Sequence, residues 1–401
     1  MPFPFEFVLF GATLLGVAIL HRHTLAVALF GLLLITAYKL VFANFHGVPG
    51  PAGLLEHLAA EWVLLANLFA LLVGFAVLSR HFQLSQLPQL LPRVLPDDWK
   101  GGFVLLGLVF VLSAFLDNIA AAVIGATAAS TVYRQRLHVG YLVAIVAASN
   151  AGGAGSVVGD TTSTMLWLDG VAPLELLRAY VGSVAAFLVF AIPAARQQQK
   201  FSPIVRDPVP DVRVDVSRVV VIVLILAGAI VANVYANTLP PESAGGFPFI
   251  GATVAGIILV VTPWRRPDWS VVPGAARGAV FLLALVVAAS MMPVDSLPEP
   301  SPQTTFGLGM VSAVFDNIPL TRLALQQGGY DWAALAYAVG FGGSMLWFGS
   351  SAGVAVANLF PEAQSTGQWL RKGWYVAVGY LVGFLVFLWV FGWQPEGPYL
   401  E

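Results

Sequence analysis

Residues 113–119 read SAFLDNI, and residues 312–318 read SAVFDNI, which is the same pattern 199 residues later. Each copy places an aspartate and an asparagine inside a long apolar stretch. The match continues downstream, because SNAG at 149–152 is followed at a similar interval by SSAG at 350–353. The chain is therefore predicted to consist of two related halves.

The composition indicates a membrane protein. Of the 401 residues, 58% are hydrophobic and only 10% are charged, whereas soluble domains carry about 25% charged residues. The absence of cysteine excludes disulfides and thiolate metal sites. No basic surface run supports nucleic-acid binding. An all-α polytopic membrane protein is the predicted fold class, with the lipid bilayer as its first partner.

Apolar stretches define the predicted spans, since a helix needs about 20 apolar residues to cross the hydrocarbon core. The N-terminal stretch lacks the basic region and cleavage site of a signal peptide, so it is interpreted as a retained span. Together with two broken helices, the stretches predict about ten spans. They fall near residues 5–20, 24–43, 60–79, 172–194, 218–236, 249–263, 275–292 and 374–393.

Basic residues set the predicted orientation. Residues 101–133 are interrupted by Asp117-Asn118 and have arginine or lysine at both ends, so the positive-inside rule favours a re-entrant hairpin entered from the cytoplasm. With periplasmic termini, 16 of the 19 Lys and Arg residues lie at the cytoplasmic side, and the loops 44–59, 237–248 and 293–302 contain none. The 16 are Arg22, Arg80, Arg93, Lys100, Arg134, Arg136, Arg196, Lys200, Arg206, Arg213, Arg218, Arg265, Arg266, Arg277, Arg371 and Lys372.

The second half is predicted to be inverted with respect to the first. It contains a hairpin at 303–329, entered from the periplasm. Two further segments, 138–168 and 331–361, are predicted to be helices broken at SNAGGAGS and GSSAG. An inverted repeat with paired broken helices is typical of secondary transporters, whose substrate site lies near the membrane midplane. The predicted domains are a first repeat at 1–194, a cytoplasmic linker at 195–217 and a second repeat at 218–401.

Oxygen-bearing side chains gather at these breaks. Asp117, Asp160 and Asp316 lie deep in apolar sequence, where burying a charge costs at least about 2.5 kcal/mol and indicates a function. Carboxylate, amide and hydroxyl oxygens suit a small hard cation, so a sodium site at these aspartates is expected. All six histidines are assigned to loops or helix ends, which leaves proton binding at depth to the aspartates. Burial and mutual repulsion favour protonated carboxyl groups.

The candidate ion- and proton-binding residues are Asp117, Asn118, Asp160, Thr161, Thr162, Asp316, Asn317, Asn150, Ser113, Ser312, Ser344, Ser350 and Ser351. For the asparagines and serines, the alternative is a structural role in bonding free backbone groups at a break. Four other charged residues are assigned to edges of the membrane, namely Glu61 and Glu175 as solvated acids and Lys39 and Arg178 as side chains that reach the interface.

Three segments resemble the ion transporter superfamily and, within it, the NhaD-type sodium/proton antiporters: SNAGGAGSVVGDTTSTMLW at 149–167, SAVFDNIPL at 312–320 and AYAVGFGGSMLWFGSSAGVA at 336–355. The resemblance implies an inverted-repeat fold, commonly dimeric, that moves a transport domain against a scaffold in an elevator mechanism. Two features depart from the pattern. Residues 119–122 read IAAA where threonines are expected, and Arg322 is not part of the pattern. Arg322 is a candidate either to hold an anion or to pair with an aspartate.

The predicted function is secondary active exchange of sodium or lithium for protons, with no cofactor, by a homodimer in a bacterial cytoplasmic (inner) membrane. Two alternatives remain at the sequence level. Arg322 and helix N-termini suit an anion such as citrate, another carboxylate or an oxyanion. An intramembrane aspartyl protease also needs two buried aspartates, but residues 157–160 read VVGD, which lacks the first glycine of a G-x-G-D motif. The chain is therefore predicted not to be an enzyme.

Overall fold

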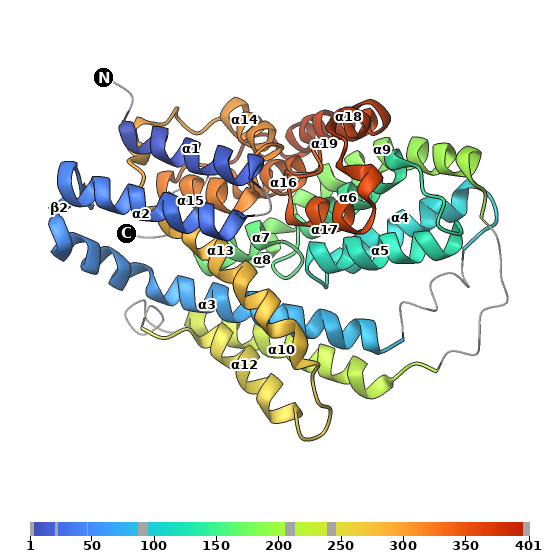
Figure 1. The fold of residues 1–401 in the computed structure, drawn as a ribbon, viewed down its shortest axis with the longest axis horizontal. Coiled ribbons are helices and arrows are strands. Elements are labelled where there is room, and N and C mark those ends of the chain that lie inside the picture. Colours follow the sequence, from blue (N-terminus) through green and yellow to red (C-terminus); the bar gives the residue numbers. More distant parts are fainter. Residues whose placement is uncertain are drawn as a thin grey trace. The chain divides into compact units, whose positions relative to one another are not determined.

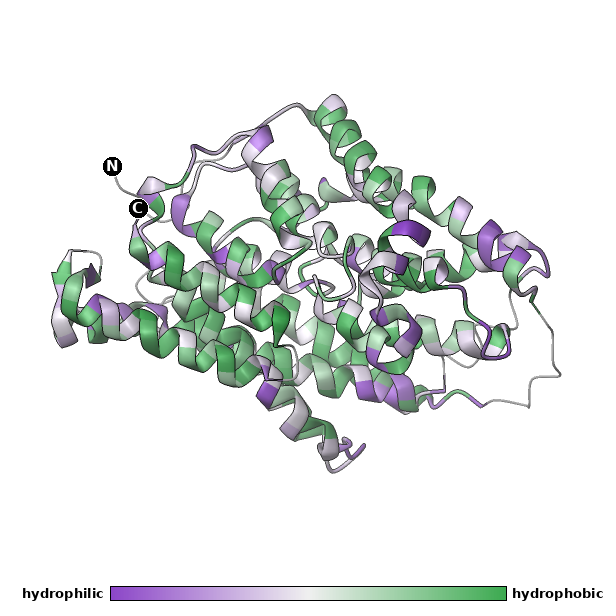
Figure 2. Ribbon diagram, turned by 45° about the horizontal axis from the view of Figure 1, so that its top comes forward, coloured by the Kyte–Doolittle hydropathy of each residue, from purple (hydrophilic) through white to green (hydrophobic). Residues whose placement is uncertain are grey.

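The structure is a computed structural model that describes residues 4–20, 23–45, 47–86, 95–204, 213–238 and 246–395. Helices dominate it (Figure 1). Five of the described helices are long and apolar enough to cross a membrane, and hydrophobic residues cover most of their length (Figure 2). The prediction of an all-α protein with several apolar spans agrees with the structure, whereas the number of ten spans stays a prediction. Arg22, Arg93, Arg206, His21 and His46 lie outside the described residues.

The chain forms two compact units, and each takes residues from both predicted repeats. Unit 1 contains residues 1–81, 216–298 and 322–327. Unit 2 contains residues 82–215, 299–321 and 328–401.

Unit 1 consists mainly of apolar helices. Helix α1 packs against α2, α2 against α13, and α10 against α12. Helix α3 contacts α12 through Asn67, whose Oδ1 accepts a hydrogen bond from the backbone N–H of Gly251 at 2.9 Å. The elements are α1 (Phe5–Ile19), α2 (Thr24–Phe42), β1 (Asn44–Phe45), β2 (Val48–Pro49), α3 (Gly50–Leu84, of which 82–84 belong to unit 2), α10 (Val216–Thr238), α12 (Phe249–Val261), η2 (Trp269–Val271), α13 (Val272–Ser290) and η3 (Val294–Ser296).

Helix α3 is much longer than the predicted span at 60–79. It has 35 residues, or about 50 Å at 1.5 Å per residue, which exceeds the thickness of the hydrocarbon core. The predicted loop 44–59 is therefore wrong in its second half. Its first half forms the two-residue strands β1 and β2, which pair antiparallel.

Unit 2 contains both helix–turn–helix segments and both interrupted helices. Helix α4 packs against α5, α6 and α9, and α14 packs against α16. Helix α16 contacts α6 and α7, α17 contacts α5 and α6, and α9 packs along α19. The elements are α4 (Trp99–Ser113), α5 (Asn118–Val132), α6 (Val139–Gly153), α7 (Thr161–Leu168), α8 (Pro173–Leu176), α9 (Ala179–Phe201), α14 (Pro302–Ser312), α15 (Asn317–Gln327, of which 322–327 belong to unit 1), α16 (Trp332–Gly342), α17 (Ser351–Leu359), η4 (Pro361–Gln364), α18 (Thr366–Lys372) and α19 (Trp374–Phe391).

Both predicted helix breaks are present, but they are shifted along the chain. The first interruption lies at 154–160, after α6 has continued through Gly153, and the second at 343–350, before α17 begins at Ser351. Ser350 caps α17 by accepting the Gly353 N–H at 3.2 Å, which explains why the serine pair starts a helix instead of interrupting one. Helix α9 also continues to Phe201, so residues 195–201 of the predicted linker are helical.

Candidate functional site

The repeated Asp-Asn pairs lie where α5 and α15 begin. The aspartate of each pair bonds to its own helix, and the asparagine bonds to Asp160. Asp117 accepts hydrogen bonds at Oδ1 from the backbone N–H groups of Ile119 and Ala120, at 2.6 and 3.4 Å. Asp316 accepts in the same way from Ile318 at 3.1 Å. Aspartate is a preferred N-cap residue because its oxygen satisfies N–H groups that lack a helical partner. Both aspartates thus commit one oxygen to their own helix.

The asparagines of these pairs converge on Asp160. Asn118 and Asn317 each donate Nδ2 to Asp160 Oδ1, both at 3.1 Å. Asn317 Nδ2 also donates to Thr162 Oγ1 at 2.8 Å. Asp160 occupies the N-cap position of α7 but makes no capping bond with its side chain. Its carboxylate is therefore directed to the two asparagines instead of its own helix, and it joins the two halves of the sequence at one point.

The network extends from Asn118 to the second helix interruption. Asn118 Nδ2 lies 3.2 Å from Asn150 Oδ1, and Asn150 Nδ2 donates to Ser344 Oγ at 3.0 Å and to Ser350 Oγ at 3.1 Å. All of these side chains are buried. Ser351 lies outside this chain of bonds and donates to Asp316 Oδ2 at 3.4 Å.

Three oxygens in the network are free to bind something else. Asp160 is 2% exposed, and its Oδ2 has no hydrogen-bond partner in the described part of the chain. Within the same residues, no hydrogen bond reaches Oδ1 of Asn118 or Oδ1 of Asn317. A buried carboxylate oxygen without a donor is costly. A proton or a hard cation would satisfy it, and oxygen ligands are what a small hard cation prefers.

The other predicted site residues have separate positions. Thr161 is the first residue of α7 and is half-buried, outside the network. Ser312 donates to the backbone carbonyl of Val339 at 2.8 Å. Ser113 is buried and its Oγ lacks a partner among the described residues. Over those residues no three acidic or histidine side chains form a group able to hold a metal ion, so Asp117, Asp160 and Asp316 do not form a shared three-carboxylate cage.

Arg322 is neutralised by an acid that the sequence assigned wrongly to a solvated edge. In unit 1, Arg322 Nη2 bonds Glu61 Oε1, and both side chains are nearly buried, at 10% and 11% exposure. Glu61 lies in α3, and it is buried because α3 is longer than predicted. The ion pair could not be predicted from the sequence near Glu61, which is apolar. Its partner Arg322 is 261 residues away along the chain.

A second correction concerns His57 and Lys39, which are both buried inside unit 1. His57 lies within α3, one turn before Glu61, and its Nε2 is 2.9 Å from Ser290 Oγ. Gln326, one turn after Arg322, donates to the backbone carbonyl of Ser290. Lys39 donates to the Met291 carbonyl instead of reaching the interface. These buried polar contacts were not predicted from the sequence.

The Glu61–Arg322 pair leads to a prediction about stability. Either Glu61→Leu or Arg322→Met alone is expected to destabilise the protein by about 3–5 kcal/mol, because each removes one member of a buried ion pair and keeps the other charge. The double variant is expected to recover most of this loss. A double-mutant cycle of unfolding in detergent measures the coupling. Additive effects of the two changes would contradict the pairing.

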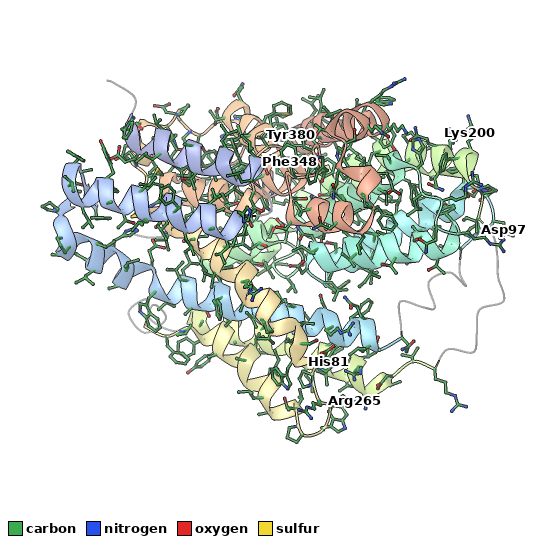
Figure 3. The ribbon with its side chains drawn as sticks, viewed as in Figure 1. His81, Asp97, Lys200, Arg265, Phe348 and Tyr380 are labelled. Carbon is green, nitrogen blue, oxygen red and sulfur yellow. The ribbon has the colours of Figure 1, made fainter. Side chains whose placement is uncertain are left out.

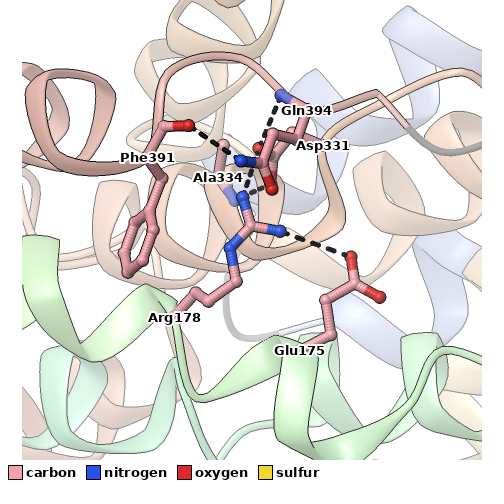
Figure 4. A network of polar contacts seen from close by, with 6 residues as sticks. All are labelled: Glu175, Arg178, Asp331, Ala334, Phe391 and Gln394. Atoms are coloured by element: carbon pink, nitrogen blue, oxygen red, sulfur yellow. Dashed lines mark hydrogen bonds and ion pairs between the residues drawn. The ribbon is translucent and has the colours of Figure 1, made fainter.

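A further buried acid, Asp331, connects three segments of unit 2: the start of α16, Arg178 before α9, and Gln394 after α19 (Figure 4). Its Oδ1 caps α16 through the Ala334 N–H at 3.1 Å, and its Oδ2 accepts from Arg178 Nη2 at 3.0 Å and from the Gln394 N–H at 3.1 Å. Glu175 Oε1 lies 3.9 Å from Arg178 Nη1. Arg178 is thus paired inside the protein, contrary to its assignment to the interface. An aspartate just before a predicted helix is a capping signal, and it would have identified Asp331.

Comparison with known proteins gives a consistent set of relatives. No family model matches the chain. "Sodium/proton antiporter 1" of Arabidopsis thaliana is 27% identical over 338 residues, which cover 75% of this chain and 56% of that relative. "Sodium/proton antiporter 2" of the same plant is 24% identical over 72% of this chain and 76% of the relative.

A third relative carries the name expected from the sequence motifs. "Na(+)/H(+) antiporter NhaD" of Alkalimonas amylolytica is 24% identical over 339 residues, or 73% of this chain and 69% of the relative. The chain thus matches little more than half of the length of the Arabidopsis antiporter 1. The three matches nevertheless relate this chain to proteins named sodium/proton antiporters, with an NhaD protein among them.

Proposed function

We propose that the protein is a secondary active transporter that exchanges sodium or lithium for protons at Asp160. The observation that carries this proposal is the Asp160 carboxylate, which is buried in unit 2 at the first helix interruption, with Oδ1 held by Asn118 and Asn317 and Oδ2 without a partner in the described chain. The names of the relatives support the same class of transport.

The proposed mechanism is competition for one carboxylate. A proton on Oδ2 neutralises Asp160. When the proton leaves, the negative charge favours an alkali cation, which takes Asp160 Oδ2 and the free amide oxygens of Asn118 and Asn317 as ligands. The two bound states exclude each other because they use the same oxygen. Thr162, Asn150, Ser344 and Ser350 keep the asparagines oriented through the hydrogen bonds described above.

We further propose an inverted repeat with an elevator movement. In chain order, three helices, an Asp-Asn segment, an interrupted helix and a last helix occur twice: α1 to α9, and α10 to α19. This order supports the repeat, and the positive-inside pattern supports hairpins entered from opposite sides with periplasmic termini. Every residue of the Asp160 network lies in unit 2, which is proposed as the moving part. We also propose that the protein is a homodimer and lies in a bacterial inner membrane.

Exchange is measured in everted vesicles that contain the protein. Added sodium or lithium is expected to dissipate a preformed pH gradient, whereas potassium is expected to have little effect. Because protons and sodium compete for Asp160, the sodium concentration that gives half the effect is expected to increase as the pH is lowered. A gradient that is unaffected by sodium and lithium, with protein shown to be inserted, would contradict the proposal.

The anion alternative depends on Arg322, and the structure offers a discriminating variant. Because Arg322 is paired with Glu61, the Glu61→Leu/Arg322→Met double variant removes the arginine without leaving a lone charge. A cation exchanger is expected to retain sodium-dependent proton movement in this variant. An anion transporter that grips its substrate with Arg322 would lose uptake of labelled citrate.

A further inference from the structure

A hollow of about 410 Å³ lies on unit 2 between the C-terminal part of α9 and the start of α19. Its walls are Ile192, Pro193, Arg196, Gln197 and Lys200 from α9, and Trp374 and Tyr375 from α19. This volume is within the usual range for small-molecule sites, about 300–1,000 Å³. None of the residues of the Asp160 network lines it, so it is separate from the proposed exchange site.

The hollow is lined by positive charge at one end and by apolar side chains at the other. Ile192, Arg196 and Lys200 are spaced by four residues, so they lie along one face of α9. Ile192 and Pro193 lie toward the middle of the helix. Lys200 lies at its C-terminal end (Figure 3). None of the residues that line the hollow is acidic. A ligand with an anionic head and an apolar tail matches this order of side chains.

Three polar residues of the hollow, Arg196, Gln197 and Tyr375, make contacts that hold them in place. The Arg196 guanidinium lies over the Trp99 ring, 4.8 Å from its centroid. The Tyr375 hydroxyl donates to the Gly140 carbonyl at 2.7 Å and lies 3.1 Å from Gln197 Oε1. Such contacts reduce the ordering that a ligand would otherwise have to impose. Arg196 and Lys200 themselves are exposed and accessible.

The start of α19 adds further positive character. Helix α19 begins at Trp374, and no side chain caps its N-terminus, so its first N–H groups carry the positive end of the helix dipole. Arg371 and Lys372 immediately precede it in sequence. Trp374 is exposed, as is usual for tryptophan at the boundary between lipid and water.

From these features we infer that the hollow between α9 and α19 binds the phosphate headgroup of an anionic phospholipid, with Arg196 and Lys200 on the phosphate and an acyl chain along Ile192 and Pro193. Basic pockets between the cytoplasmic ends of membrane helices suit such headgroups, and both helices are apolar enough to span a bilayer. Free phosphate would use the two cations but would leave the apolar half of the hollow empty.

The test is a binding titration of the full-length protein in detergent with phosphatidylglycerol, with phosphatidylcholine of the same acyl chains, and with inorganic phosphate. Phosphatidylglycerol is expected to bind at least about tenfold more tightly than phosphatidylcholine. The Arg196→Gln/Lys200→Gln variant is expected to lose this preference. The Arg266→Gln/Arg277→Gln variant removes the same charge from two exposed residues of unit 1, and is expected to keep it.

A second variant covers the case in which the double substitution does not fold. Ile192→Trp fills the apolar half of the hollow without changing its charge, and it is expected to weaken phosphatidylglycerol binding by at least about tenfold. Equal affinity of the wild type and both hollow variants for phosphatidylglycerol would overturn the inference. So would inorganic phosphate binding as tightly as the lipid through the same two residues, because the site would then be one for a free anion.

Discussion

Asp160→Asn is expected to reduce sodium- and lithium-dependent dissipation of a pH gradient to the level of vesicles without the protein. The substitution keeps the size of the side chain but removes the negative charge and the proton-binding oxygen. Oδ1 and Oδ2 have different surroundings, since Oδ1 accepts from Asn118 and Asn317 while Oδ2 has no partner among the described residues. An amide at this position would neither hold a proton nor balance a cation. The measurement is the initial rate of dissipation at several sodium concentrations.

Asp98→Asn is the matched control for this loss. Asp98 caps α4, its side chain is 52% exposed, and asparagine caps helices about as well as aspartate. Its ion pair with Lys100, at 3.9 Å, is an exposed one, worth about 0–1 kcal/mol. This variant is therefore expected to exchange ions like the wild type. Wild-type rates in Asp160→Asn, with the amount of inserted protein equal, would remove Asp160 from the mechanism.

Gly340→Ala is expected to reduce the exchange rate by at least about tenfold, although it adds a single methyl group. A Cβ at Gly340 would lie 2.9 Å from Asp160 Oδ2 and 3.6 Å from the Ala154 Cβ. The new carbon would therefore occupy the space in front of the carboxylate oxygen that we propose binds the ion. The initial rate and the sodium concentration for half-maximal effect both measure this change.

Gly307→Ala separates this local effect from the general effect of alanine in a helix. Gly307 lies in α14, and a Cβ there would meet no atom within 4 Å. Alanine in place of glycine stabilises a helix by about 0.5–1 kcal/mol, so neither variant is expected to lose helix stability through its backbone. If Gly340→Ala exchanged as rapidly as Gly307→Ala, the space beside Asp160 Oδ2 would not be used by the ion.

The pattern of hydropathy predicted the helical elements well, because lipid-facing helices must be apolar over their whole length. The predicted spans at 5–20 and 24–43 match α1 and α2 closely. The boundaries were less accurate where polar residues lie inside helices. Helix α3 begins at Gly50 and α9 ends at Phe201, because hydropathy marks the membrane-embedded part of a helix and not its ends.

The candidate site was predicted as a set of residues but not as an arrangement. The Asp-Asn pairs and the SNAG segment predicted Asn118, Asn150 and Asn317 as site residues. In the structure Asn118 and Asn317 donate to Asp160, and Asn150 accepts from Asn118. The three predicted aspartates differ in the structure. Asp117 and Asp316 cap their own helices, whereas the side chain of Asp160 does not. The sequence contains no signal for this difference, because it depends on which donors approach from other helices.

The sequence by itself determined that this is a helical membrane protein, and that polar residues lie at breaks in its apolar stretches; the relation between its two halves stays a prediction. These properties follow from composition, periodicity and repetition, which are local. Only the tertiary structure decided that Arg322 is paired with Glu61, that Arg178 is paired with Asp331, and that Asp160 receives both repeated asparagines. The physical reason is that a buried charge is stabilised by the partner that the fold brings to it, and here those partners come from sequence positions 42 to 261 residues away.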